Sequence, residues 1–448
     1  MKPLHVSRRT SIASLLLGAA LLGGCSDSDD NDSSPVSTPV ANFDAGLAVD
    51  WFTLLHQSVR VESLNPPVAS RRIAYASVAF YEGLVNGMPD YRSMGEQLNG
   101  LDELPARPAG VMHWPSVANQ AIATVMLDLF TGASQPTLDS IAALRDSTAD
   151  VYDDTVSAAV IARSIDYGDE LAAAIIAWSQ TDGFTIWNNC AYTVPIGPGL
   201  WEPTPPAFTP NPLQPCWGNL RPFALLYAAE CSPLPHPAYS TSTTSPFYAE
   251  ALEVYNVVNA ADPDQIAIAQ FWADGGGSLT PPGHWVSILC QVCDQEGYSL
   301  DVAAEAAAKV GIGVADAFIS CWEMKYHYNL LRPITYIRDG AGPINDGAWV
   351  TVAGVGTPPF PEYTSGHSVQ SGAASLLLQD QFGAVAFTDD THNGTYPARS
   401  FTSFLEASNE AALSRLYGGI HYRAACERGV EQGFCIAQTI LDNVEFRD

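Results

Sequence analysis

The sequence predicts an all-α fold, and three observations support this prediction. Ala-rich stretches with apolar residues at three- and four-residue spacing recur along the chain. Runs that alternate between apolar and polar residues, as strands require, are scarce. Hydrophobic residues make up 47% of the 448 residues and charged residues only 15%, which is typical of a large protein with a well-buried core. We expect a core of this size to divide into two sub-bundles or two domains.

The predicted helices follow from this spacing and from the distribution of proline. The helical pattern is clearest at residues 71–84, 116–130, 158–179, 247–259 and 302–328. The segment 193–237 holds 12 of the 32 prolines, which excludes regular helix there. We interpret it as a long loop between two helical regions. Because Cys190, Cys216 and Cys231 lie at its edges or within it, we expect one or two disulfides to hold it.

The first 25 residues are typical of an export signal. Lys2, Arg8 and Arg9 precede a run of apolar and small residues at 12–24 that is too short to span a bilayer. The run ends in Leu-Gly-Gly-Cys25, which resembles the bacterial lipobox, where the cysteine is lipidated and becomes the mature N-terminus. We therefore expect a signal peptide at residues 1–25 and an exported protein that Cys25 anchors to the cell envelope. Export through the general secretory or the twin-arginine pathway stays open.

The charge balance excludes some partners. The formal net charge is −28, and it becomes −31 without residues 1–24, which hold three basic and no acidic side chains. Such a chain is not expected to bind nucleic acid or anionic membrane surfaces, so the lipid anchor is its expected membrane contact. Besides Cys25, eight cysteines remain, an even number that allows up to four disulfides after export. Residues 26–43 are predicted to be a disordered acidic linker, followed by helical regions at 44–237 and 238–448.

The residues that carry chemistry lie in the C-terminal third, in three motifs. In the first, Lys325 and Arg332 are seven residues apart, close to two helical turns, so we expect both on one helix face. Pro333 disfavours helix at the preceding residue and places Arg332 at the helix end. A solvated basic pair on a surface helix is the alternative.

The second motif is Ser365-Gly366-His367, which precedes a helical run at 368–379. Thr364 or Ser365 is the expected N-cap. Gly366 would let backbone N–H groups approach an oxyanion, which the helix dipole also favours. The alternative is an ordinary N-cap with a surface histidine.

The third motif is Ser414-Arg415 followed by Gly418-Gly419 and His421. The two glycines are expected to end the helix that carries Arg415. His421 is then expected to open the next helix, which ends near Asp442. This turn could return Arg415 and His421 to one pocket.

Together the motifs read Lys-x6-Arg-Pro, Ser-Gly-His and Ser-Arg-x5-His, a pattern that resembles the vanadium-dependent haloperoxidases. This family shares its fold and anion pocket with the type-2 phosphatidic-acid phosphatases and the bacterial acid phosphatases. The motifs cover residues 325–421, and the stretches 271–274 and 280–285 also resemble bacterial haloperoxidases. The resemblance implies two helical bundles of the haloperoxidase type, with the Pro-rich loop between them, and a catalytic C-terminal region.

The resemblance also implies a cofactor and residue roles. The cofactor is vanadate, with its oxygens bound by Lys325, Arg332, Ser365, Gly366 and Arg415. His421 is the implied metal ligand. The implied catalytic residues are His367, a general acid and base, and Lys325, which polarises peroxide. Trp322 and Phe360 match aromatic positions of the halide pocket, with plain core packing as the alternative, and Asp274 is a candidate partner for one arginine.

The implied reaction is oxidation of halide by hydrogen peroxide to hypohalous acid, with bromide or iodide favoured over chloride. Small organic molecules are further candidate acceptors, and the sequence leaves the oligomeric state open. Thr364 departs from the family, which usually has proline at that position. Cys290-x2-Cys293 is expected to be a disulfide or two buried thiols rather than a zinc site. Structural roles are expected for His284, His327 and His392.

Two other functions stay open. A lipid-anchored acid phosphatase would use the same pocket with His421 as the nucleophile. Phosphatases typically place an aspartate four residues after this histidine to orient it, and this chain has Ala425 there, although Glu427 could substitute. The non-enzymatic alternative is a surface lipoprotein that only binds oxyanions.

Overall fold

The structure, a computed structural model, describes residues 36–153 and 155–448. Residues 37–448 form one compact unit. Its α-helices are α1 Gly46–Val61, α2 Pro66–Val85, α3 Trp114–Leu129, α4 Gln135–Asp153, α5 Ala158–Ser179, α6 Phe184–Trp187, α7 Pro246–Ala260, α8 Pro263–Phe271, α9 Thr280–Glu296, α10 Leu300–Tyr328, α11 Pro333–Arg338, α12 Gly366–Phe382, α13 Phe404–Tyr417 and α14 Arg423–Asn443. The signal peptide and Cys25 lie outside the described residues, so export and lipidation stay predictions. The division into two helical regions at residue 237 also stays a prediction.

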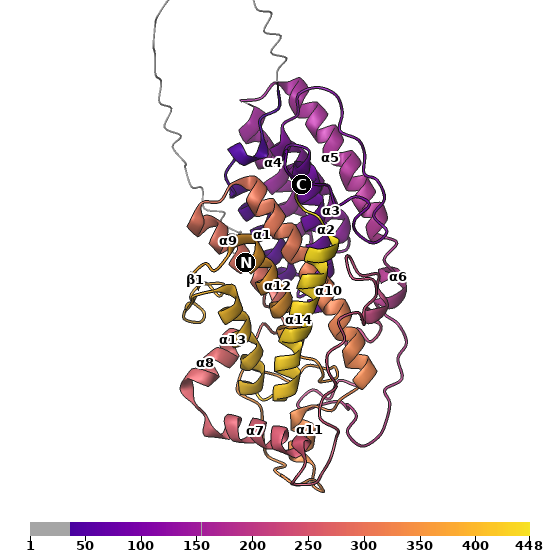
Figure 1. The fold of residues 1–448 in the computed structure, drawn as a ribbon, viewed down its shortest axis with the longest axis vertical. Coiled ribbons are helices and arrows are strands. Elements are labelled where there is room, and N and C mark those ends of the chain that lie inside the picture. The colour runs from indigo at the N-terminus through magenta and orange to yellow at the C-terminus, as the bar shows by residue number, and fades with distance from the viewer. Residues whose placement is uncertain (1–35, 154) are drawn as a thin grey trace, which may run out of the picture. The chain divides into compact units, whose positions relative to one another are not determined.

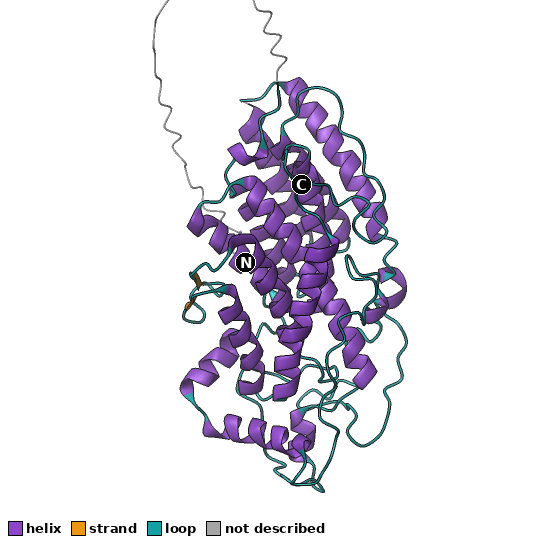
Figure 2. Ribbon diagram, in the orientation of Figure 1, coloured by secondary structure: helices purple, strands orange, loops and turns teal. Residues whose placement is uncertain are grey.

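The predicted all-α fold is confirmed, as Figure 2 shows. The described strands are limited to one antiparallel pair, β1 Phe387–Asp389 and β2 Arg399–Phe401. Two helices begin where the sequence supplies both a cap and a proline: α2 follows Asn65, which accepts a hydrogen bond from the Val68 N–H, and α7 follows Ser245, which accepts one from the Tyr248 N–H. Among the described residues, no helix combines the length and the apolar composition needed to span a bilayer.

The long helix α10 packs against α2 and α12 at the centre of the fold, and α12 also packs against α14 (Figure 1). Small residues of α10 permit this close packing. A Cβ on Gly311 would lie 2.6 Å from the Ser77 Oγ of α2, and a Cβ on Gly313 would lie 2.4 Å from the Leu377 Cδ1 of α12. The Ala-rich sequence of α10 therefore brings its neighbours close on two sides.

The contact between α12 and α14 depends on glycine as well. A Cβ on Gly433 of α14 would lie 2.2 Å from the Val369 carbonyl oxygen, and a Cβ on Gly372 of α12 would lie 2.6 Å from the Val430 carbonyl oxygen. Real Cβ atoms essentially never approach so closely, so both positions require glycine at this helix spacing. The contact fixes the N-terminus of α12 relative to α14.

The Pro-rich segment 193–237 contains no α-helix and only the short 3₁₀ helix η2, Trp217–Asn219, as its prolines predict. Disulfides Cys190–Cys216 and Cys231–Cys435 confirm the expected disulfide support, and the second joins the segment to α14. The segment lies against α10, where the Leu213 carbonyl accepts hydrogen bonds from Trp322 and Tyr326.

In the described part of the chain, four further cysteines are buried and form no disulfide: Cys290, Cys293, Cys321 and Cys426. Of the two roles expected for Cys290 and Cys293, the structure therefore has the buried thiols.

The folded chain begins before residue 44, where the sequence predicted the end of a disordered linker. Residues Val40–Asn42 form the 3₁₀ helix η1, and the Val40 side chain is fully buried. The Val40 N–H donates to the Gly87 carbonyl oxygen at 3.0 Å, which ties this segment to the end of α2. The extension of the disordered linker to residue 43 was therefore wrong, because an apolar side chain within it reaches the core.

Candidate active site

The three sequence motifs meet where α10, α12 and α13 approach the start of α14. The structure buries Lys325, Arg332, Ser365, Arg415 and His421 almost completely. Gly366 and His367 are half-buried and lie at the partly exposed edge of this group. All seven positions predicted from the motifs therefore lie in the same region of the fold.

Lys325 and Arg332 do not share one helix, contrary to the sequence prediction. Helix α10 ends at Tyr328, where Asn329 adopts a left-handed conformation with φ 48° and its N–H donates to the Lys325 carbonyl oxygen. Arg332 lies beyond this turn, as the N-cap of α11 with an extended backbone. The seven-residue spacing fits a helix equally well, and the left-handed Asn329 redirects the chain instead.

The Lys325 ammonium is held by backbone carbonyls of the segment that leads into α12. Its Nζ lies 3.2 Å from the Pro361 oxygen and 3.0 Å from the Glu362 oxygen, and it also donates to the Thr364 oxygen. Burial, together with the charge of Arg332, lowers the pKa of Lys325 to about 8. Lys325 is therefore a cation near neutral pH that loses its charge in mildly alkaline solution.

The two arginines are cations with unused donors. Arg332 donates from Nε to the Phe360 oxygen at 2.9 Å and from Nη1 to the Ile420 oxygen at 2.9 Å. Its Nη2 and the Nε of Arg415 are buried, and neither has a hydrogen-bond partner among the described residues. Burial lowers the pKa of both to about 10, so both stay charged at neutral pH. Because unpaired buried donors are costly, these groups fit a bound anion.

The N-terminus of α12 contributes backbone N–H groups to the same region. Ser365 is the N-cap, which confirms one of the two predicted caps, and its Oγ accepts from the Ser368 N–H at 3.3 Å. The first N–H groups of a helix have no partner within the helix, and they favour an anion. A Cβ on Gly366 would lie 3.4 Å from the Trp322 ring, so the backbone and this aromatic ring approach closely.

His421 is oriented by a carboxylate that the sequence analysis did not single out. Its Nδ1 lies 2.8 Å from the Glu362 Oε1, which also accepts from the Tyr422 N–H at 2.9 Å. Its Nε2 lies 3.1 Å from Arg332 Nη1, and because arginine can only donate, Nε2 carries the lone pair. Burial, then Arg332 and Lys325, keep the pKa of His421 well below its ordinary value. His421 therefore presents a neutral ring whose unprotonated Nε2 accepts a hydrogen bond from Arg332, and the same lone pair could bind a metal in place of that bond.

Glu362 overturns one argument drawn from the sequence. Ala425 leaves no carboxylate four residues after His421, but Glu362 supplies one from another segment. Glu427, the expected substitute, instead pairs with Arg423 at 3.2 Å. The signal that pointed to Glu362 was an acidic residue directly before Tyr363-Thr364-Ser365, inside the second motif. His421 itself lies before α14, with Tyr422 as the N-cap, rather than opening the helix as predicted.

His367 lies beside Arg415 at the edge of the site. The distance from His367 Nε2 to Arg415 Nη1 is 3.3 Å, and Arg415 Nη1 also donates to the Trp272 carbonyl oxygen. Burial and the charge of Arg415 keep the pKa of His367 well below its ordinary value, against the opposing charge of Asp274. His367 is therefore neutral near pH 7 and able to accept a proton.

The two predicted aromatic residues form one side of the cation cluster. The rings of Trp322 and Phe360 lie 5.0 Å apart, tilted by 48°. The Phe360 centroid lies 5.1 Å from Lys325 Nζ and 4.9 Å from the Arg332 guanidinium carbon. The Phe360 ring therefore holds both cations by cation–π contact.

Asp274 has a different direct partner from the one predicted. Its Oδ2 lies 2.9 Å from Nδ1 of His284, so its hydrogen-bond partner is a histidine where an arginine was predicted. Its influence on Arg415 is through charge, which raises the arginine pKa against burial. The sequence placed Asp274 near an arginine but could not show that the intervening histidine takes its hydrogen bond.

Comparisons with known proteins agree with this geometry. A family model described as the VCPO second helical-bundle domain matches residues 305–447. Vanadium chloroperoxidase from Curvularia inaequalis is 26% identical over 228 residues, which is 38% of this chain and 37% of that protein. The chain thus matches well under half the length of this relative.

Two solved structures are also similar to this chain. One, described as the first bacterial vanadium-dependent iodoperoxidase, is 36% identical, covers 91% of this chain and 98% of its own, and has a TM-score of 0.82. A holo-type bacterial vanadium-dependent chloroperoxidase, 15% identical, covers 85% of this chain and 93% of its own with a TM-score of 0.62. The second match shows the fold alone.

Proposed function

The chain belongs to the vanadium-dependent haloperoxidases, and on that basis we propose that it oxidises halide with hydrogen peroxide to hypohalous acid, with bromide or iodide favoured over chloride. The observation that carries the proposal is the state of His421. Its Nε2 lone pair lies among Arg332, Lys325 and Arg415, while Glu362 holds Nδ1. A ligand nitrogen within a cluster of buried cations suits a metal oxyanion.

The residues present fit vanadate as the cofactor. Among the described residues, no carboxylate forms a salt bridge with Lys325, Arg332 or Arg415, so the positive charge is available to an anion. Arg332 Nη2 and Arg415 Nε supply unused donors, and Ser365 and Gly366 begin the helix whose N-terminus favours negative charge. His421 would be the metal ligand. Bound vanadate supplies Lewis acidity that activates peroxide toward attack by halide.

The chain's own residues handle protons and position the reactants. His367, neutral at pH 7 and half-buried, accepts a proton from hydrogen peroxide as it enters and later returns a proton to the departing oxygen. The positive charge of Lys325 withdraws electron density from the peroxide. Trp322 and Phe360 exclude water beside Lys325, where a large polarisable halide is favoured. The structure that is 36% identical to this chain is described as an iodoperoxidase, which supports the halide preference. Small organic molecules are the proposed acceptors of the hypohalous acid.

The test incubates the metal-free protein with orthovanadate and measures iodide, bromide and chloride oxidation by peroxide, beside hydrolysis of p-nitrophenyl phosphate. We expect vanadate-dependent halide oxidation that His421→Ala abolishes. Halide oxidation that does not depend on vanadate would contradict the proposal.

An acid phosphatase with the same pocket is the second candidate, and the pairing of Glu362 with His421 favours it. A nucleophilic histidine needs such a carboxylate, and the distance of 2.8 Å meets this need. Phosphate hydrolysis without halide oxidation, in the same assay, would establish this function instead.

We also propose export and lipid anchoring through Cys25. The two disulfides support an oxidising compartment. Metabolic labelling with a fatty acid, lost in Cys25→Ala, is the test.

A further inference from the structure

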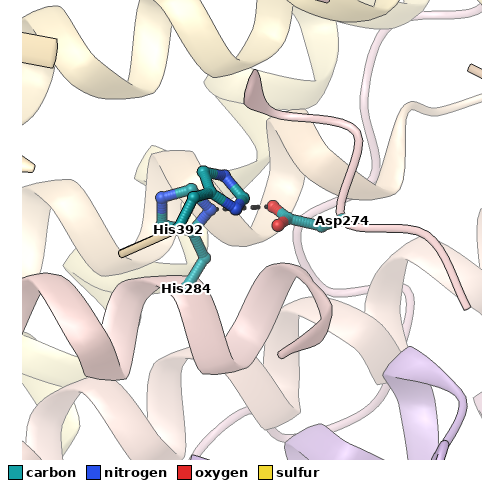
Figure 3. A group of neighbouring side chains, drawn as sticks. All are labelled: Asp274, His284 and His392. Carbon is teal, nitrogen blue, oxygen red and sulfur yellow. Dashed lines mark hydrogen bonds and ion pairs between the residues drawn. The ribbon is translucent and has the colours of Figure 1, made fainter. Parts of the chain in front are cut away.

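Close to His367, the imidazole of His284 lies between two carboxylates. Its Nδ1 is 2.9 Å from Asp274 Oδ2 and its Nε2 is 2.8 Å from Asp389 Oδ2, and all three side chains are buried. His284 belongs to the first turns of α9, Asp389 ends β1, and Asp274 lies between α8 and α9. Figure 3 shows His284 and Asp274 pointing toward each other, with His392 beside them. The sequence analysis gave His284 only a structural role.

The two contacts decide the protonation of the ring. An ionised carboxylate only accepts hydrogen bonds, so a ring that bonds two of them must carry hydrogen on both nitrogens. The two carboxylates raise the pKa of His284 to about 10 against burial, and the pKa of each aspartate is lowered by His284. Trp272 stacks on the ring at 4.4 Å and 20°, which also favours a cation. His284 is therefore an imidazolium at neutral pH.

The same place does not favour a metal ion, although Asp274, His284 and His392 offer ligand atoms within 4.8 Å of one another. Both nitrogens of His284 are in use, and His392 Nε2 lies 2.6 Å from the Phe271 carbonyl oxygen. The imidazolium bonds both carboxylates and offsets one of their two negative charges, so a divalent cation would have to displace a proton of the ring to bind here.

This group reaches the active site through the segment 272–274. The Trp272 carbonyl oxygen accepts from Arg415 Nη1 and also bonds His367. Asp274, at the other end of the segment, bonds His284 and acts by charge on Arg415 and His367. The stack on Trp272 and the bond to Asp274 thus join His284 to both ends of the segment.

We propose that His284 is a positioning residue: as an imidazolium shared by Asp274 and Asp389, it fixes the segment 272–274 that holds Arg415 and His367. The side chains that face it are Asp274 and Asp389 by hydrogen bonds, His392, Trp272 and Phe271 by ring contact, and His56 of α1 and His367 by charge. The effect on turnover rests on the proposed function. The effect on vanadate affinity rests on it as well, whereas the protonation state of His284 does not.

The first experiment records ¹⁵N NMR spectra of histidine-labelled protein from pH 6 to 9, with His284→Gln to assign the signal. We expect two protonated ring nitrogens for His284 throughout this range. A ring with one protonated nitrogen at pH 7 would overturn the inference and leave the proposed function intact.

The second experiment measures vanadate affinity by calorimetry in four proteins: wild type, His284→Gln, Asp389→Asn and the control His392→Gln. We expect roughly tenfold weaker binding in His284→Gln, a smaller loss in Asp389→Asn, and no change in the control, whose ring bonds only the Phe271 carbonyl. Equal affinity in His284→Gln and wild type would overturn the inference. So would a stoichiometric divalent cation in the purified protein that both histidine variants lose, because the site would then bind a metal.

The third measurement separates positioning from general stability by the pH profile of halide oxidation. His284→Gln removes a positive charge that lowers the pKa of His367, so that pKa should rise. The part of the kcat/KM–pH curve that reports His367 should therefore move to higher pH, by roughly half a unit to one unit. Asp389→Asn keeps the shape but removes a negative charge, so the same part of the curve should move to lower pH. A lower rate with this part of the curve unmoved in both variants would mean a merely structural role. Asp389→Asn preserves the side-chain volume, so it tests the inference even where His284→Gln does not fold.

Discussion

Glu362 Oε1 lies 2.8 Å from Nδ1 of His421, so the residue expected to bind vanadium is fixed by a carboxylate from the neighbouring motif. The same oxygen accepts the Tyr422 N–H, which ties the start of α14 to the segment before α12. Burial raises the pKa of Glu362 to about 8, while Arg332 lowers it. The role of Glu362 therefore depends on its acceptor oxygen and only partly on its charge.

Replacing Glu362 separates these two contributions. Glu362→Leu removes the acceptor from Nδ1, and we expect vanadate affinity to fall by about 10- to 100-fold. Glu362→Gln keeps an acceptor oxygen and should lose at most a few-fold. Calorimetric titration of the metal-free proteins gives both values, with surface variant Glu427→Gln as the control. Wild-type affinity in Glu362→Leu would show that the contact does not orient His421.

The pH dependence of anion binding should report Lys325. Its pKa is lowered to about 8 in the folded protein, so its charge is present below that pH and is lost as the pH rises through it. We expect the contribution of Lys325 to vanadate affinity to disappear between about pH 7 and 9. Vanadate itself changes protonation over this range, so the measurement compares wild type with Lys325→Arg, in which the side chain at this position stays charged. The ratio of their affinities should change with pH, and a constant ratio would contradict a lowered pKa.

The motifs predicted the site well because they encode local events. Ser365 caps a helix, and Gly418 and Gly419 end one, so both features are set by neighbouring residues. The fold class followed in the same way from periodicity. These signals need no knowledge of distant contacts.

The errors arose where local sequence fits two structures or where the partner is distant. The spacing of Lys325 and Arg332 fits a helix, and only the left-handed Asn329 shows that the helix ends between them. The contact of His284 with Asp389 joins residues 105 positions apart, and periodicity carries no information on such pairs.

Gly433 tests whether the spacing of α12 and α14 sets the site. In Gly433→Ala the new Cβ would lie 2.2 Å from the Val369 oxygen, so the helices must separate. We expect the free energy of unfolding to fall by about 1–3 kcal/mol, seen in thermal denaturation, with weaker vanadate binding. Gly356→Ala is the matched control, since nothing lies within 4 Å of its Cβ. An unchanged melting temperature in Gly433→Ala would contradict the tight packing.

Phe360 tests the proposed halide position. Its ring lies 5.1 Å from Lys325 Nζ and 4.9 Å from the Arg332 guanidinium carbon. Phe360→Leu keeps an apolar side chain but loses the cation–π contacts that hold Lys325 and Arg332. From a loss of roughly 1 kcal/mol in the positioning of these cations, we expect the KM for bromide to rise about threefold to tenfold. Steady-state kinetics at saturating peroxide measure this. Phe382→Leu, at the other end of α12, should leave KM unchanged, and equal effects of the two variants would remove Phe360 from the halide site.

The two disulfides should differ in their effect on stability because they close loops of different length. Cys231–Cys435 spans 204 residues and Cys190–Cys216 spans 26. If loop entropy dominates, the double variant Cys231→Ser/Cys435→Ser should lose about 5 kcal/mol of unfolding free energy, and Cys190→Ser/Cys216→Ser about 3.5 kcal/mol. Chemical denaturation of both variants and wild type gives the values. The longer loop also holds residues near the site, since Tyr363 and Arg428 donate to the carbonyl oxygen of Leu234, three residues after Cys231. A larger loss in the 26-residue pair would mean that contacts of the Pro-rich segment, and not loop closure, determine how much each disulfide stabilises the protein.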